Sequence, residues 1–479
     1  MKITRKESAF LMLSILVILG LTLPAMIQDG MFMDGQQYAC VAKNLAHGKG
    51  SFWFPYLSNT WYMSGSPYFM EQPPLVYYLQ SIFFNLFGDS MYVERIYSLA
   101  VALLSAFLII KIWKIFPFED KSLHELSWVP VLCWISIPTT YWSFNNNMLE
   151  NTMGLFTLIA VYAILHALIK NKQVLLFLII GGLATFCATL SKGLPGFFPL
   201  ACPIFYWLAF PEKITLKKAL GISIILISVT VILYYCLLWY PPAYESLHFY
   251  ISKRLLYRVA NNPTVSNRFY IFGGIFEEII VPILLCLLVN FILGFKIKKE
   301  LLAKVNIKAI FFFTLIALSA SLPLMLTPVQ KKFYMTPAFA FFGIAIAIPL
   351  AIGTKTWYNQ KFNTSQSLRK LKLFSGILLI LLAGVCILFI GKSSRDKKML
   401  NDVYLIGRLI PKESTITLAT NMHEIWSLQF YLLRKYNISC TFPPNQKKYF
   451  LQEKNHPECD TLIYKKCNIK LEDYELYSK

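Results

Sequence analysis

Long apolar runs with almost no charged residues recur along this chain, and they constrain its fold more than any other feature. The first run, from Ser8 to Gln28, contains no charged residue. As a helix it is long enough to cross about 30 Å of hydrocarbon. Lys2, Arg5 and Lys6 precede it and no clear small-residue cleavage site follows it. We therefore expect an uncleaved membrane anchor with a cytoplasmic N-terminus rather than a signal peptide.

Similar apolar runs predict about eleven membrane spans, and at most about thirteen. They lie near residues 8–28, 91–113, 127–144, 148–169, 173–191, 194–211, 219–240, 269–295, 309–328, 333–354 and 372–391. A content of 56% hydrophobic and only 15% charged residues agrees with a chain built mainly for lipid. The fold class predicted is a polytopic α-helical membrane protein.

The net charge of +21 would indicate nucleic-acid binding in a water-soluble chain. Here the lysines and arginines gather in short connections between apolar runs, where such residues set membrane topology. If the first span runs outward, the basic clusters at 111–114, 170–172, 213–218, 296–308 and 355–372 all fall on the cytoplasmic side. The charge is therefore explained by topology, and no nucleic-acid partner is expected.

Two segments outside the spans are long enough to carry function. Residues 29–90 form the predicted first outer loop. Within it, 73–87 is apolar but short and opens with two prolines, so we expect a helix in the interface. Residues 392–479 are rich in Lys, Asn, Glu and Tyr and predict a small outer-facing α/β domain, with strands over 414–420 and 461–464 and a helix over 423–436. The predicted domains are thus 1–391 and 392–479.

The ten cysteines show no metal-ligand spacing. Most lie in or beside spans, where cysteine usually acts as a small apolar residue. Cys440, Cys459 and Cys467 lie in the outer domain, where two of the three could form a disulfide in an oxidising compartment. Their odd number leaves the pairing open.

Three carboxylates lie on the predicted outer side of the membrane. Asp34 follows the first span, Glu71 lies in the first outer loop, and Glu150 opens the fourth span. Ionisable groups at the ends of spans are costly and tend to face protein or a water-filled cavity, so each is a candidate functional residue. The alternative is simple solvation at the interface.

Cations also lie on the predicted outer side, against the topological bias. A phosphate or pyrophosphate held at the membrane surface would explain them, because Arg and Lys form charge-assisted hydrogen bonds to phosphate oxygens. Anionic lipid headgroups are the alternative ligand. The residues are Lys192, Lys253, Arg254, Arg258, Arg268, Lys331 and Lys332.

Carboxylates close to a basic, lipid-accessible pocket suit the transfer of a sugar from a polyprenyl-phosphate carrier to a hydroxyl group. A carboxylate, for which we choose Asp34, would take the acceptor proton, while cations offset the charge on the departing phosphate. Asp34, Glu71 and Glu150 could equally hold a divalent metal ion, although no spacing establishes a site. The competing classes are a flippase or other transporter of lipid-linked sugars, and a non-catalytic polyprenyl-phosphate-binding protein of envelope assembly. Ionisable groups gathered at one face favour the enzyme.

The motifs around these carboxylates resemble glycosyltransferase family 39 of the GT-C membrane glycosyltransferases, which includes the protein O-mannosyltransferases and ArnT-like enzymes. The resemblance is strongest over 34–95, with Asp34…Tyr38-Ala39 followed by Pro67-Tyr68-Phe69…Glu71…Pro73-Pro74-Leu75. Met148-Leu149-Glu150, Ser191-Lys192-Gly193 and Lys332-Phe333-Tyr334 resemble later motifs.

The resemblance implies a GT-C fold, an undecaprenyl-phosphate-linked sugar donor, inversion at the sugar carbon and chemistry on the periplasmic or extracellular side of the bacterial cytoplasmic membrane. The acceptor would be lipid A, a protein or another glycan. The resemblance assigns the acidic residue of the first loop, Asp34, to the active site. Glu150 looks like the family's second acidic motif, and we expect it to act in the catalytic site by shaping it or by helping to bind acceptor or metal. We add Tyr38, Glu71, Gln72 and Tyr334 as substrate-binding candidates. Two departures bear on the donor: Gln37 and Gln72 stand where the family often has Arg and Lys. The phosphate contacts are therefore expected from Lys192, Arg254, Arg258, Lys331 and Lys332.

Overall fold

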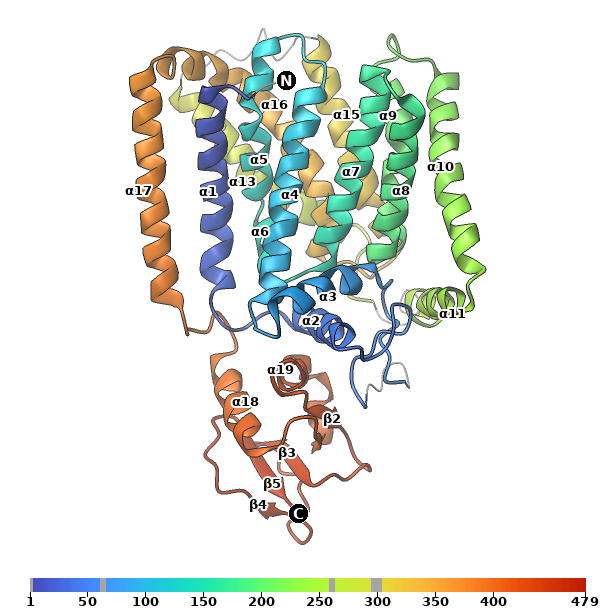
Figure 1. The fold of residues 1–479 in the computed structure, drawn as a ribbon, viewed down its shortest axis with the longest axis vertical. Coiled ribbons are helices and arrows are strands. Elements are labelled where there is room, and N and C mark those ends of the chain that lie inside the picture. Colours follow the sequence, from blue (N-terminus) through green and yellow to red (C-terminus); the bar gives the residue numbers. More distant parts are fainter. Residues whose placement is uncertain (1–2, 61–65, 258–262, 294–303) are drawn as a thin grey trace. The chain divides into compact units, whose positions relative to one another are not determined.

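The structure is a computed structural model that describes residues 3–60, 66–257, 263–293 and 304–479 (Figure 1). Within these ranges, nine helices are long and apolar enough to cross a membrane. The helices that supply these spans are α1 (Arg5–Met26), α4 (Val93–Ile115), α7 (Leu149–Lys170), α8 (Val174–Lys192), α10 (Leu216–Leu238), α13 (Tyr270–Ile292), α15 (Lys304–Ser321), α16 (Thr336–Lys361) and α17 (Ser365–Phe389). The predicted polytopic helical architecture is confirmed, although the count of eleven spans is not.

Two of the eleven predicted spans are broken helices, which explains the difference in count. The run 127–144 divides into α5 (Trp128–Ile135) and α6 (Pro138–Asn145). The run 194–211 divides into the 3₁₀ helix η2 (Leu194–Ala201) and α9 (Cys202–Ala209). A proline stands at each break or just after it, and proline removes a backbone donor and crowds the preceding turn. Hydropathy alone does not register such a break.

Shorter helices occupy the connections. The predicted interfacial helix is α3 (Leu75–Phe87), whose 13 residues rise only about 20 Å and so fall short of a span. The others are α2 (Met33–Ala46), η1 (Lys121–Leu126), α11 (Pro241–Phe249), the π-helix η3 (Tyr250–Leu256), η4 (Leu322–Leu326) and η5 (Lys332–Met335).

The chain forms two compact units. We call Met1–Leu23, Ser98–Phe144 and Met148–Leu388 the membrane unit, and Pro24–Tyr97, Asn145–Asn147 and Phe389–Lys479 the loop unit. The first outer loop, 29–90, thus falls in the same unit as the C-terminal segment. The domain limits 1–391 and 392–479 stay a prediction.

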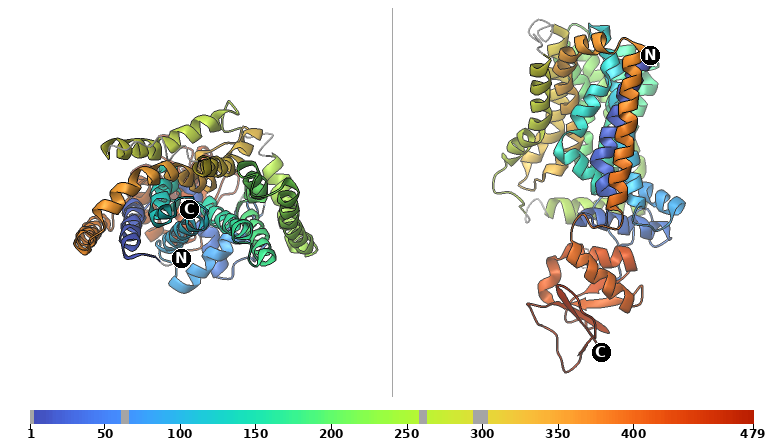
Figure 2. Two further views of the ribbon diagram at one scale, coloured as in Figure 1. Left: turned by 90° about the horizontal axis from the view of Figure 1, so that it is seen from above. Right: turned by 90° about the vertical axis from the view of Figure 1, so that its left-hand side faces the viewer.

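The long helices of the membrane unit run side by side as a bundle (Figures 1 and 2). Helix α16 packs against α5, α7, α13 and α15, and 83% of its span is buried, whereas only 11% of the α17 span is buried. Gly343 of α16 permits a close approach, because a Cβ there would lie 2.9 Å from the Trp134 backbone. Helix α16 therefore lies at the core of the bundle, and α17 presents most of its apolar surface outward.

The C-terminal part of the loop unit is a small α/β fold, as predicted. Its five-stranded sheet has the order β2-β1-β3-β5-β4, with β1 parallel to β2 and β3, and β5 antiparallel to β3 and β4. The elements are α18 (Lys397–Leu409), β1 (Thr415–Leu418), η6 (Thr420–Glu424), α19 (Trp426–Tyr436), β2 (Ser439–Thr441), β3 (Tyr449–Glu453), β4 (Lys465–Lys466) and β5 (Tyr474–Ser478). Helix α19 links the parallel strands β1 and β2.

The strand predicted over 461–464 is wrong. These residues form a turn, in which the Asp460 carboxylate accepts a hydrogen bond from the Leu462 N–H at 2.9 Å and the Asp460 carbonyl accepts from Tyr464 N–H at 3.0 Å. Aspartate stabilises such turns by bonding to the backbone two residues on. Pairing with β5 begins only at Lys465. Cys440, Cys459 and Cys467 are all free thiols.

Candidate functional site

Asp34 lies in the first turn of α2, in the loop unit, and is half-buried. Ten consecutive residues after it, from Gly35 to Asn44, are buried, so α2 is held firmly along its length. A negative side chain is favoured in the first turn of a helix by the orphan N–H groups and the helix dipole. Asp34 is therefore placed as a carboxylate at the accessible end of an otherwise buried helix.

The start of α2 is held by Asn146 and Asn147. The Asn146 side chain accepts a hydrogen bond from the Phe32 N–H at 2.8 Å, and the Asn147 amide donates to the Gly35 carbonyl at 3.2 Å. Gln80 of α3 in turn donates to Asn147 at 2.6 Å. Asn147 precedes Glu150 by three residues, so the segment that orients Asp34 leads directly into the second acidic motif.

Three other predicted site residues lie in the loop unit. Tyr38 is buried in α2, with its ring 6.0 Å from that of Tyr77. Glu71 is 5% exposed and Gln72 is half-buried, just before α3. A carboxylate as buried as Glu71 is a costly group to keep.

In the membrane unit, Glu150, Lys192 and Tyr334 lie together. Glu150 is in the first turn of α7, and its carboxylate lies 3.2 Å from the Lys192 ammonium in the last turn of α8. The side chains are only 1% and 10% exposed. The Lys192 ammonium also lies 5.8 Å from the centre of the Tyr334 ring. Three residues predicted from separate motifs thus form one charged cluster.

A glycine turn sets the position of Lys192. Gly193 has φ +89°, which favours glycine, and a Cβ there would lie 2.1 Å from the Tyr250 hydroxyl. That hydroxyl donates to the Lys192 carbonyl at 3.4 Å. Burial raises the pKa of Tyr250, so it remains a neutral hydroxyl at physiological pH. Tyr250 was not identified from the sequence, because no motif marks it.

The remaining predicted cations are placed differently from one another. Arg254 is half-buried on η3, one turn beyond Tyr250, and π-helical turns often occur at functional sites. Lys331 is exposed. Arg258 lies outside the described residues.

Lys332 forms an ion pair with Glu277, and its ammonium lies 3.9 Å from the Glu278 carboxylate. Glu278 is 5% exposed and accepts a hydrogen bond from the Thr139 N–H, at the start of α6, at 2.8 Å. These two carboxylates were missed, although an acidic pair inside the apolar run 269–295 was a visible signal. A phosphate at Lys332 would compete with them.

The structure offers no ready-made metal cage among its described residues, since no three His, Cys, Asp or Glu side chains gather there in a suitable arrangement. Asp34 and Glu71 belong to the loop unit, and Glu150 belongs to the membrane unit.

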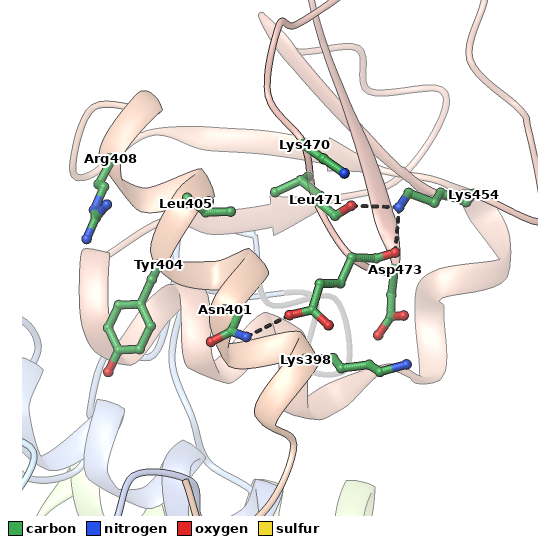
Figure 3. Close-up of a pocket in the computed structure, with 10 residues that line it drawn as sticks. Lys398, Asn401, Tyr404, Leu405, Arg408, Lys454, Lys470, Leu471 and Asp473 are labelled. Carbon is green, nitrogen blue, oxygen red and sulfur yellow. Dashed lines mark hydrogen bonds between the residues drawn. The ribbon is translucent and has the colours of Figure 1, made fainter. Parts of the chain in front are cut away.

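A separate groove of about 760 Å³ lies in the C-terminal α/β fold (Figure 3). Residues of α18 and of the segments around 454 and 470–473 line it, and Lys454 donates to the carbonyls of Leu471 and Glu472 at 2.6 and 2.5 Å. None of the predicted site residues that the structure describes lines this groove.

Comparison with known proteins identifies the fold. The model of the dolichyl-phosphate-mannose-protein mannosyltransferase family matches residues 71–239. Sequence comparison with curated proteins finds no match. ArnT from Cupriavidus metallidurans, in a structure bound to undecaprenyl phosphate, is 12% identical, with 97% of each chain covered and a TM-score of 0.63. Its apo structure is 11% identical, with 96% of each chain covered and the same TM-score.

The two ArnT matches cover 97% and 96% of this chain, so they include residues of both compact units. The resemblance inferred from the loop motifs is confirmed by the family match and by the shared fold. The chain therefore has the GT-C glycosyltransferase fold, of the ArnT-like type.

Proposed function

We propose that this protein transfers a sugar from a polyprenyl-phosphate donor, with undecaprenyl as the expected lipid, to a hydroxyl acceptor at the outer face of the bacterial cytoplasmic membrane. The acceptor class is lipid A, a protein or another glycan. The observation that carries the proposal is the match of fold to ArnT over 97% of both chains, one of whose structures holds undecaprenyl phosphate.

Asp34 is the proposed general base. In this reaction the acceptor oxygen attacks the anomeric carbon, the bond from that carbon to the phosphate oxygen breaks, and the acceptor proton passes to the Asp34 carboxylate. Attack opposite the departing phosphate inverts the anomeric carbon. The position of Asp34 in the first turn of α2 supports this role, because a base must begin the reaction without its proton.

Lys192 is the proposed contact to the donor phosphate. An ammonium has three N–H donors, so Lys192 can contact Glu150 and a phosphate oxygen at the same time. Arg254 and Arg258 are further candidate phosphate contacts, while Lys332 is the weaker candidate because it already pairs with Glu277. Glu150 holds Lys192 in place and keeps the buried charge compensated.

The first test compares wild type with Asp34→Asn in lipid, using radiolabelled undecaprenyl-phosphate sugars and a membrane extract as acceptor. We expect wild type to transfer label and Asp34→Asn to lose at least about a hundredfold in rate, since general acid–base catalysis contributes roughly 10²–10⁴-fold. The matched control is Asp89→Asn, in the same unit, whose exposed carboxylate pairs with His47 at 2.8 Å. This control should transfer sugar at the wild-type rate.

Other outcomes separate the competing classes. Equal transfer by wild type and Asp34→Asn would contradict the assignment of the base. Movement of labelled lipid across the bilayer without sugar transfer would favour the transporter. Binding of the labelled lipid with neither activity would favour the non-catalytic binding protein.

A further inference from the structure

Residues Asp29, Gly30 and Met31, which lie shortly before α2, contact C-terminal residues of the same unit. The Asp29 N–H donates to the Lys392 carbonyl at 2.8 Å, and the Ser394 N–H donates to the Asp29 carbonyl at 2.7 Å. Gly30 has φ +90°, and a Cβ there would lie 2.8 Å from the Arg395 carbonyl oxygen. The two chain segments therefore lie in close backbone contact, immediately before the helix that carries Asp34.

The Asp29 side chain strengthens this contact. It accepts hydrogen bonds from Lys435 at 2.9 Å, from the Gly30 N–H at 2.7 Å and from the Tyr404 hydroxyl. Burial alone would raise the pKa of Asp29, but the Lys435 charge and these hydrogen bonds outweigh burial and hold the pKa below its usual value. Asp29 is thus ionised at physiological pH and anchors α18 and α19 to the start of the loop.

Tyr431 of α19 bonds to the backbone of Met31, three residues before Asp34. Its side chain is fully buried, and its hydroxyl accepts a hydrogen bond from the Met31 N–H at 3.0 Å. The Met31 carbonyl and the Asp396 carboxylate each lie 3.0 Å away as acceptors for its one proton. Met31 is itself 1% exposed, so its N–H has no easy access to water. A buried donor that loses its partner is costly, so this hydroxyl restrains the backbone three residues before Asp34.

From these contacts we infer that Tyr431 is a positioning residue for the sugar transfer: its hydroxyl fixes the Met31 backbone and, through it, the start of α2 and the Asp34 carboxylate. The inference rests on the proposed function. It assigns the C-terminal α/β fold a role in catalysis that no loop motif reveals. A small displacement of a catalytic group lowers the rate of the chemical step far more than it weakens substrate binding. Loss of the Tyr431 hydroxyl is therefore expected to lower kcat more than it changes KM.

The variant Tyr431→Phe tests this, because it removes the hydroxyl and keeps the ring. Its matched control is Tyr464→Phe. Tyr464 is also buried, at 2% exposed, and its hydroxyl donates to the Lys447 carbonyl at 2.7 Å within the C-terminal fold, away from the loop. We expect Tyr431→Phe to lower kcat at least about tenfold with the donor KM within about twofold of wild type. Tyr464→Phe should leave both constants unchanged.

Amide hydrogen exchange of the full chain supplies a readout that needs no substrate. Tyr431→Phe should speed exchange over residues 31–37 by about tenfold or more, and Tyr464→Phe should not. Unchanged exchange in Tyr431→Phe would overturn the inference, as would wild-type kcat despite faster exchange. An equal loss of kcat in Tyr431→Phe and Tyr464→Phe would also contradict the inference, because it would indicate general destabilisation of the C-terminal fold. If wild type transfers no sugar from any donor, the proposed function fails and the catalytic role falls with it, while exchange still reports whether the restraint exists.

Discussion

The buried pair of Glu150 and Lys192 is the most constrained charge constellation among the predicted site residues. Each residue was singled out for a separate reason: Glu150 as an acid at the end of a span, and Lys192 as a cation on the face where cations are unusual. Their separation of 3.2 Å connects the two arguments. A lysine at the last turn of α8 and a glutamate at the first turn of α7 also agree with the helix dipoles at those ends.

We expect Glu150→Gln and Lys192→Gln each to destabilise the protein by roughly 3–5 kcal/mol, because breaking a buried pair leaves the other charge uncompensated. The double variant should cost less than the sum of the two. Lys192→Gln should also raise the donor KM more than the acceptor KM. Denaturant unfolding in detergent and steady-state kinetics measure these effects.

The more exposed pair of Lys308 and Glu212, at 2.7 Å, is the control for this cycle and should show no measurable coupling. Additive effects of the two buried substitutions would argue against the Glu150–Lys192 interaction. An equal rise in both KM values would argue against a specific contact with the donor phosphate.

At the scale of elements, the start of α2 depends on one glycine. A Cβ on Gly35 would lie 2.1 Å from the Asn146 carbonyl oxygen and 2.8 Å from the Met31 sulfur, so α2 could not keep its position. We expect Gly35→Ala to lower sugar transfer by about a hundredfold, since a misplacement of about 1 Å has an effect of that order.

Gly20→Ala, in helix α1, is the matched control, because nothing lies within 4 Å of a Cβ at that position. It should retain wild-type activity and thermal stability. The same assay and a thermal unfolding curve check both variants, and wild-type activity in Gly35→Ala would show that the start of α2 tolerates movement.

The sequence predicted most elements but not their interruptions. The long spans and the helix α19 were visible from apolar spacing. The breaks just before Pro138 and just before Pro203 were not, because a hydropathy window averages over them. Residues 461–464 are of types that favour a strand, but the hydrogen bond from the Leu462 N–H to the Asp460 carboxylate stabilises a turn there instead.

For the whole molecule, the distribution of lysines predicts its orientation in the membrane. Alkaline phosphatase fused after Lys479 should be active, because the C-terminal fold is expected on the outer side, whereas a fusion after Lys361 should be inactive. Green fluorescent protein at the same two positions should give the opposite pattern. An active phosphatase at Lys361 would indicate the opposite orientation in the membrane, with Asp34 on the cytoplasmic side.

The sequence by itself determined the spans, the basic connections and the acidic motifs, since each of these is local. A bilayer requires about 20 consecutive apolar residues whatever the rest of the chain does. Only the tertiary structure decided which charges meet. Lys192 pairs with Glu150 across two helices, and Tyr431 bonds to Met31, 400 residues away in the chain. Such contacts depend on how the helices pack. Buried polar groups need a hydrogen-bond partner, and the packing decides which residue is close enough to be that partner.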